Sequence, residues 1–219
     1  MRRKLERFAQ NRLSRNVLEH GKDIFETIKG NWSSFFGNEQ PLVVELGCGR
    51  GEYTIGLAQV ETSQNYIGVD IKGDRIWKGS TQAQSLGLDH VAFLRTQIHL
   101  LDRFFEVGEI SEIWITFPDP RPKDRDIKRR LTSPRFLQMY QTLLKADGWV
   151  KFKTDSTPLF DYTLSLFDSE VKVKDLEFTH DLYNSPLLSE HHGVKTKYEK
   201  IFTDKGEDIK YMKFRFVPQ

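Results

Sequence analysis

Two short motifs in this 219-residue chain have the residue types of a nucleotide-binding site. An apolar run that begins at Leu42 leads into Glu45-Leu46-Gly47-Cys48-Gly49-Arg50-Gly51, with glycine at every second position. A second apolar run, 66–69, ends in Asp70. Glycines let a ligand approach the backbone closely, and a carboxylate after the next strand can accept hydrogen bonds from ribose hydroxyls. A strand that ends in a flexible turn is the alternative, and the spaced Asp70 favours the ligand.

The spacing of the glycines distinguishes between two kinds of nucleotide ligand. Dinucleotide-binding folds use Gly-x-Gly-x-x-Gly, whereas this chain has Glu-x-Gly-x-Gly-x-Gly. The second pattern resembles motif I of S-adenosylmethionine-dependent methyltransferases. This resemblance implies that Gly47, Gly49 and Gly51 form a cofactor loop, and that Glu45 helps to hold the amino group of the cofactor.

A third group of chemically capable residues follows the apolar stretch 110–117. The chain continues as Pro118-Asp119-Pro120-Arg121-Pro122-Lys123, in which three prolines restrict the backbone around Asp119. A rigid turn with an acidic residue has the same composition. The functional interpretation uses Asp119 for chemistry on a nucleobase, and the residues alone leave both interpretations open.

Positive charge is concentrated in two segments of a chain whose formal net charge is only +2. Residues 1–15 contain six Lys or Arg against one acidic residue, and residues 119–135 contain seven against three. Two basic clusters beside a ligand-binding fold favour a localised anionic partner such as nucleic acid. Two solvated surface runs are the alternative.

The elements that must position these residues are predicted by the pattern of apolar runs. Strands are expected at 42–46, 65–69, 91–95, 110–117, 149–153, 171–179 and 208–217, and helices at 51–60, 72–86, 99–106, 134–145 and 157–167. This alternation indicates an α/β fold with a mainly parallel sheet and right-handed crossovers. Because no long helix separates the last two strands, the end of the sheet is expected to be antiparallel.

The N-terminal part of the chain is expected to be an appendage to this sheet. Leu5, Phe8, Leu13, Val17 and Leu18 recur at helical spacing, so we divide the chain into a basic helical arm, 1–38, and a ligand-binding domain, 39–219. Ligands bind beyond the carboxyl ends of parallel strands. The glycine loop, Asp70 and Asp119 should therefore meet at one edge of the sheet.

Four further segments resemble the bacterial tRNA (guanine-N7)-methyltransferase family. They are Phe117-Pro118-Asp119-Pro120-Arg121-Pro122-Lys123, Lys128-Arg129-Arg130-Leu131-Thr132-Ser133-Pro134-Arg135-Phe136, Lys153-Thr154-Asp155 and Thr196-Lys197-Tyr198-Glu199-Lys200-Ile201-Phe202. This ordered set is far more specific than a glycine loop. The resemblance implies a Rossmann-like class I methyltransferase: a mainly parallel seven-stranded sheet with an antiparallel last strand and helices on both faces. It also implies S-adenosylmethionine as cofactor and tRNA as substrate, methylated at N7 of a guanine in the variable loop.

The site residues follow from the resemblance by position. Glu45, Asp70, Gln97 and Asp119 stand where the family contacts the cofactor, and Asp119 also stands where the catalytic role is usually given. Lys123, Asp155, Thr196, Lys197, Tyr198 and Glu199 stand where the family contacts substrate. Thr196 and Glu199 also have the spacing of a capping box, and both interpretations hold together if the start of that helix faces the cleft.

Three positions depart from the pattern of the family. Arg121 stands where many members have Trp, Asp126 where many have His, and Gln97 where Asp or Asn is common. Arg can stack on a base in place of Trp, and Gln can still donate and accept hydrogen bonds. The departures affect the expected geometry around the base more than the expected reaction.

The remaining features limit the environment and the class of protein. The one cysteine, Cys48, excludes an internal disulfide and is expected to pack inside the glycine loop. No metal is required, and His191-His192 are expected to be loop residues within a mobile insertion, 181–195. We expect a cytoplasmic protein with no membrane partner, as a monomer or homodimer. The alternatives are a methyltransferase for another RNA, a protein or a metabolite, and a non-enzymatic RNA-binding protein that keeps a vestigial cofactor fold.

Overall fold

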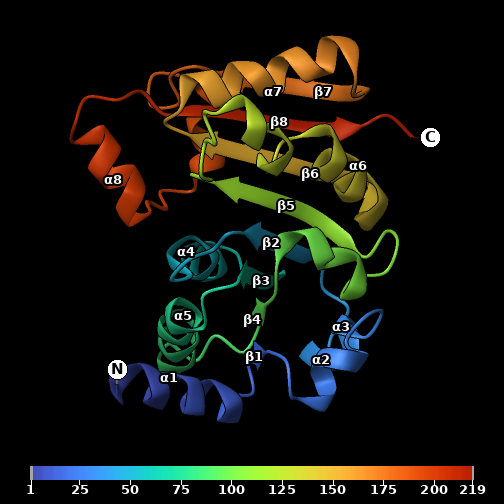
Figure 1. The fold of residues 1–219 in the computed structure, drawn as a ribbon, viewed down its shortest axis with the longest axis vertical. Coiled ribbons are helices and arrows are strands. Elements are labelled where there is room, and N and C mark those ends of the chain that lie inside the picture. Colours follow the sequence, from blue (N-terminus) through green and yellow to red (C-terminus); the bar gives the residue numbers. More distant parts are fainter. Residues whose placement is uncertain (1, 219) are drawn as a thin grey trace.

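The computed structural model describes residues 2–218, with side chains from residue 4 onward, as an α/β fold built on one sheet (Figure 1). The strands are β1 (Val17–Leu18), β2 (Leu42–Leu46), β3 (Asn65–Asp70), β4 (Val91–Arg95), β5 (Ile110–Thr116), β6 (Leu144–Thr154), β7 (Val173–Thr179) and β8 (Lys210–Phe216). The helices are α1 (Arg2–Leu13), α2 (Asp23–Thr27), α3 (Trp32–Phe36), α4 (Glu52–Val60), α5 (Gly73–Ser85), α6 (Pro134–Leu143), α7 (Thr157–Ser169) and α8 (Lys197–Thr203). Three short 3-10 helices complete it: η1 (Ile98–Arg103), η2 (Asp124–Arg129) and η3 (Pro186–His191).

The sheet has the strand order β1-β4-β3-β2-β5-β6-β8-β7. Among the described strands, β8 runs antiparallel to both of its neighbours, and the other pairs are parallel. The predicted parallel sheet with an antiparallel end is therefore confirmed. The sheet has eight strands within residues 2–218 and not seven, because the short β1 adds to the edge at β4.

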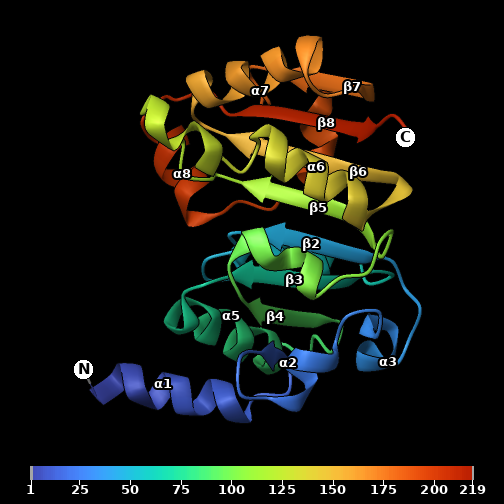
Figure 2. The same cartoon turned by 45° about the vertical axis from the view of Figure 1, so that its right-hand side comes forward.

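Helices cover both faces of the sheet, as expected (Figures 1 and 2). All five residues of β2 are buried, and alternate side chains enter two separate cores. Val44 and Leu46 join the core with α6, α7, η1, α2 and α3, whereas Val43 joins the core with α4 and α5. A central strand that is buried on both faces has a continuous apolar run in its sequence, and this run allowed the strand before Gly47 to be predicted.

The N-terminal arm is only partly the helix that the spacing predicts. α1 is helical, but Val17 and Leu18 form β1 and pair in parallel with Phe93 and Leu94 of β4. The prediction of helix at these two residues is wrong, because burial in the sheet edge outweighs their helical spacing. The division of the chain at residue 38 stays a prediction.

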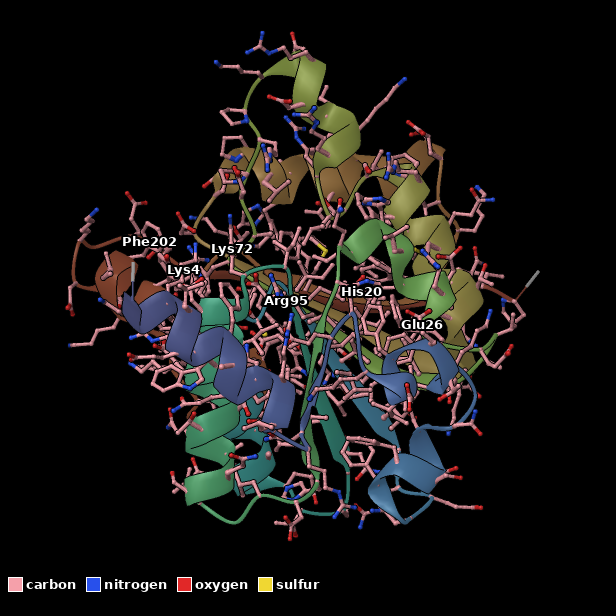
Figure 3. The ribbon with its side chains drawn as sticks, turned by 60° about the horizontal axis from the view of Figure 1, so that its bottom comes forward. Lys4, His20, Glu26, Lys72, Arg95 and Phe202 are labelled. Carbon is pink, nitrogen blue, oxygen red and sulfur yellow. The ribbon has the colours of Figure 1, made fainter. Side chains whose placement is uncertain are left out.

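α1 packs on α5 through several specific contacts. Asn11 donates to the carbonyl of Gly73 at 2.8 Å, and the guanidinium of Arg7 lies 4.6 Å from the centre of the Trp77 ring. Figure 3 shows α1 lying over α5, with Lys4 and Lys72 toward the left of the view and Glu26 toward the right. The basic segment is therefore a docked helix over the part that the structure describes.

Two further segments differ from the expectation. β6 begins at Leu144, where a helix through 145 and a strand only from 149 were predicted. A register shift against β5 accommodates the extra residues. The expected mobile insertion, 181–195, belongs to a longer segment between β7 and β8, residues 180–209, which we call the β7–β8 connection. Leu182 and Val194 of this connection are buried in the core with α4, so it is packed against the sheet.

Candidate active site

A cavity of about 700 Å³ opens at the carboxyl edge of the parallel strands. Its walls come from the loops after β2, β3, β5 and β6, and from α8. The residues that line it are Glu45–Arg50, Glu52, Tyr53, Asp70, Arg75, Thr116–Pro120, Leu131, Asp155, Thr196–Tyr198, Ile201 and Phe202. Figures 1 and 2 show α8 and the start of α4 at this edge, to which the arrows of β2 and β5 point. The convergence expected from topology is therefore present.

The glycine loop between β2 and α4 has three positive φ angles, at Gly47 (75°), Gly49 (57°) and Gly51 (72°). A Cβ atom built at Gly47 would meet nothing within 4 Å, so this backbone faces open space. A Cβ atom at Gly51 would lie 2.6 Å from the ring of Phe93, and Gly51 does not line the cavity. Gly47 and Gly49 thus leave room for a ligand, whereas Gly51 permits α4 to pack on β4.

Asp70 holds this loop from the end of β3. One carboxylate oxygen accepts from the amide of Gly49 at 3.0 Å, and the other accepts from the amide of Lys72 at 2.7 Å. Asp70 is 8% exposed and lines the cavity. A carboxylate offers about four acceptor positions, so these two bonds leave capacity for hydroxyl groups of a ligand.

Glu45 lies at the floor of the cavity and is almost fully buried. One oxygen accepts from the amide and hydroxyl of Thr54, and the other accepts from the hydroxyl of Thr116 at 2.6 Å. Burial raises the pKa of Glu45, although these hydrogen bonds oppose the shift. Neither threonine was predicted as a site residue, because Thr54 lies on α4 and Thr116 on β5, and each meets Glu45 only in the folded structure.

The loop after β5 presents Asp119 to the cavity with a largely exposed side chain. Its carboxylate pairs with Nε of Arg121 at 3.1 Å and accepts from the amide of Arg121 at 3.2 Å. Phe117 and Arg121 both have φ of 47°, a left-handed conformation that is uncommon for bulky residues and concentrates at functional sites. Because Arg121 stands where many members of the family have Trp, this chain has a guanidinium group paired with Asp119.

α8 contributes a further part of the cavity wall. Its start is the capping box that the sequence allowed: the hydroxyl of Thr196 accepts from the amide of Glu199 at 3.1 Å, and the Glu199 carboxylate accepts from the amide of Thr196. Thr196, Lys197 and Tyr198 line the cavity, together with Ile201 of the next turn. Tyr198 is 57% exposed, which leaves its ring free to contact a large substrate.

Glu199 differs from its neighbours because its side chain is completely buried and does not line the cavity. Its carboxylate pairs with Nζ of Lys153 at 2.9 Å and with Nε2 of His191 at 2.7 Å. His191, which we expected to be a loop residue, is a buried partner in this cluster. Burial opposes ionisation of Glu199, but the hydrogen bond of His191 and the charge of Lys153 outweigh it and lower its pKa to about 2.

Three other predicted site residues differ in their relation to the cavity. Asp155 lines it after β6 and is half-buried, and burial raises its pKa. Gln97 and Lys123 are exposed residues just before η1 and η2, and neither lines the cavity. Arg50, Glu52 and Arg75 line it without having been predicted as site residues, because a charged residue at the start of a helix carries no distinctive signal.

Within residues 2–218, no group of three or more His, Cys, Asp or Glu side chains could hold a metal ion. No helix in that part of the chain has the length and apolar character needed to cross a membrane.

Comparisons with solved structures agree with the fold. An antibiotic-related methyltransferase superimposes with a TM-score of 0.62 at 16% identity, covering 86% of this chain and 94% of that one. A 16S rRNA methyltransferase, KamB, superimposes with a TM-score of 0.61 at 14% identity, covering 91% of this chain and 96% of that one. At these identities the likeness shows the class I methyltransferase fold alone.

Comparisons of sequence identify the family. A family model described as "Putative methyltransferase" matches residues 39–212. A tRNA (guanine-N(7)-)-methyltransferase of Cytophaga hutchinsonii is 50% identical over 218 residues, which cover 99% of each chain. A protein of the same name from Bacteroides thetaiotaomicron is 46% identical over 222 residues, covering 99% of this chain and 86% of that one. The cavity at the carboxyl edge and these full-length relatives lead to one conclusion: the chain belongs to the tRNA (guanine-N(7)-)-methyltransferase family.

Proposed function

We propose that this protein transfers a methyl group from S-adenosylmethionine to N7 of a guanine in the variable loop of tRNA. The observation that carries the proposal is that one cavity is lined by the glycine loop, Asp70, the exposed Asp119 and the family segment at the start of α8. Relatives named for this reaction match the chain over its full length.

The residues present fit the cofactor. Gly47 and Gly49 leave an open cradle beside Asp70, whose carboxylate retains free acceptor positions. Glu45 supplies negative charge at the floor of the same cavity. S-adenosylmethionine, when bound, supplies a methyl group on a positively charged sulfur. In this proposal Asp70 accepts hydrogen bonds from the ribose hydroxyls of the cofactor, and Glu45 helps to hold its amino group.

Methylation at N7 of guanine depends mainly on how the enzyme positions the base relative to the methyl group. N7 carries a free lone pair on the major-groove edge, so it needs no deprotonation before it attacks a methyl group. Catalysis can then consist of holding N7 in line at near-attack distance. We assign to Asp119 the electrostatic stabilisation of the cationic 7-methylguanine, and to Asp155 a hydrogen bond from the base.

Exposed cations around this edge suit the phosphates of tRNA. Lys197 lies at the start of α8, Arg50 in the glycine loop and Arg75 on α5, and all three line the cavity. Lys4 and Lys72 lie on the side of the molecule where Figure 3 also shows Phe202 of α8. Lys123 and the last turn of η2, with Lys128 and Arg129, add cations next to the loop that holds Asp119. Gln97 remains a proposed contact of the adenine ring.

The test is incubation of the protein with labelled S-adenosylmethionine and unmodified bulk tRNA, followed by nucleoside analysis. The expected product is 7-methylguanosine from the variable loop. In a parallel incubation with ribosomal RNA, label in that RNA and none in tRNA would support a methyltransferase for another RNA. Failure to bind S-adenosylmethionine in calorimetry would instead support an RNA-binding protein with a vestigial cofactor fold.

The proposed substrate also suggests where the protein acts and how it assembles. Bacterial tRNA is modified in the cytoplasm, so we place the protein there, with Cys48 as a reduced and buried thiol. Sedimentation equilibrium in the presence and absence of tRNA would decide between a monomer and a homodimer.

A further inference from the structure

The sheet face beneath the β7–β8 connection carries three lysines. Strand register places Lys151 beside Trp114 of β5 and Lys213 of β8, and it places Lys153 beside Tyr211. Lys151 is 8% exposed and Lys153 is fully buried. A buried ammonium group is stable only when an acceptor compensates for its lost hydration.

Two carboxylates of the β7–β8 connection supply that compensation. Glu190, at the end of η3, pairs with Lys151 at 3.1 Å and with Lys213 at 2.9 Å; Lys151 also pairs with Glu112 of β5 at 3.0 Å, and Lys213 with Glu177 of β7 at 3.1 Å. Glu199, on α8, pairs with Lys153 at 2.9 Å. The connection is thus attached to the sheet at two points, through lysines only two residues apart on β6.

The second point of attachment is the more completely enclosed. One oxygen of Glu199 accepts from Lys153, and the other pairs with His191 at 2.7 Å and accepts from the hydroxyl of Tyr183 at 2.9 Å. Nζ of Lys153 also lies 4.3 Å from the centre of the Tyr53 ring. Because both charged side chains are 0% exposed, neither touches a substrate in the cavity in this arrangement.

The enclosed pair acts on a short helix. α8 has seven residues, which is too short for a helix to be stable without tertiary contacts. Residues on either side of Glu199, Tyr198 and Ile201, line the cavity. An interaction that holds Glu199 therefore helps to fix the position of α8 and of the side chains that it presents to the cavity.

We propose that Lys153 and Glu199 are positioning residues: their buried ion pair holds α8 so that Thr196, Lys197 and Tyr198 face the guanine. This inference rests on the proposed function for the identity of the substrate. It changes the role that the family resemblance gave to Glu199, from a substrate contact to the support of substrate contacts.

The experiment uses three variants: Lys153→Met, Glu199→Gln and the double variant that combines these two changes. Glu190→Gln serves as a separate control, because Glu190 is a carboxylate of the same connection and pairs with the same strand but is not on α8; its partner Lys151 keeps Glu112 in the variant. Measurements are kcat/KM for tRNA, the dissociation constant of S-adenosylmethionine, thermal stability, and hydrogen exchange of the α8 amides.

Lys153→Met and Glu199→Gln should each lower kcat/KM for tRNA at least tenfold and accelerate exchange of the α8 amides. The dissociation constant of S-adenosylmethionine should change less than twofold, since Gly47, Gly49 and Asp70 do not lie on α8. The double variant should be no worse than either single variant, because it leaves no unpaired buried charge. Glu190→Gln should lower stability and keep kcat/KM within twofold.

Loss of activity in Glu199→Gln with normal activity in Lys153→Met would overturn the inference in favour of direct substrate contact. An equal loss in Glu190→Gln would reduce the pair to general stability. Absence of 7-methylguanosine from the wild-type protein is a different result, and it counts against the proposed function. In that case the α8 exchange rates still decide whether the pair positions the helix.

Discussion

The amide of Lys197 donates a hydrogen bond to the carboxylate of Glu52 at 2.7 Å across 145 residues of sequence. Glu52 begins α4 directly after the glycine loop, and Lys197 begins α8. Two parts of the cavity wall are therefore joined at their helix starts.

Glu52→Ala should weaken the use of tRNA more than the binding of cofactor. A hydrogen bond to a charged group contributes about 1.5–3 kcal/mol, less at a partly exposed site, so kcat/KM for tRNA should fall roughly three- to thirtyfold. Glu52→Gln keeps an acceptor and should retain most of the activity. Steady-state kinetics of the two variants would check this, and equal losses would mean that the charge of Glu52 matters and not the bond.

Asp70→Ala should weaken the binding of S-adenosylmethionine more than the binding of tRNA. The variant loses acceptors for the proposed ribose hydroxyls and also the bond that holds Gly49. A charge-assisted hydrogen bond contributes about 1.5–3 kcal/mol, so the dissociation constant should rise by roughly one to two orders of magnitude. Calorimetry measures it directly, and an unchanged constant would contradict the assignment of Asp70.

Asp119→Asn should lower the rate of methyl transfer by about 10²–10³, the loss typical of removing one preorganised electrostatic contact. Asparagine keeps the shape of the side chain but not its charge, and it weakens the ion pair with Arg121. Single-turnover kinetics with saturating enzyme isolate the chemical step. A rate within about threefold of wild type would leave Asp119 a turn residue and direct attention to Asp155.

Replacing Arg2, Arg3 and Lys4 by Gln should weaken tRNA binding and flatten its salt dependence, with cofactor affinity intact. The side chains of the two arginines lie outside the described part of the chain. Each phosphate contact contributes a log–log salt slope of about 0.9 for duplex and less for single strands. Arg7 belongs in a separate variant, because it stacks on Trp77 and helps to dock α1. Binding titrations over a range of salt concentrations test both, and an unchanged slope would exclude the arm from the interface.

Acid should destabilise the protein partly through Glu199. Its pKa falls from 4.5 to about 2 in the folded state, so its contribution to stability is fully present above pH 4.5 and is lost as the pH falls toward 2. By linkage a shift of this size corresponds to about 3 kcal/mol. Denaturant unfolding of wild type and Glu199→Gln between pH 6 and about pH 3 measures it. Identical pH dependence in both proteins would show that Glu199 is not held in its charged form.

Local patterns were enough to predict the parallel sheet and the motifs at its edge. The glycine loop and Asp70 are short-range features: each follows a buried strand whose apolar run is continuous. Since parallel topology brings the carboxyl ends of strands together, the meeting of these residues with Asp119 followed without knowledge of any contact.

Long-range contacts decided the rest, and periodicity carries no information about them. Val17 and Leu18 have helical spacing but form β1, because the edge of β4 offers burial that a helix does not. Glu199 belongs to the same motif as three residues that line the cavity, but it is buried because it pairs with Lys153. Lys153 is 46 residues away in the sequence and meets Glu199 only in the folded sheet. The sequence by itself determined which residues gather at the edge of the sheet; the tertiary structure decided which of them face the cavity and which hold it in shape.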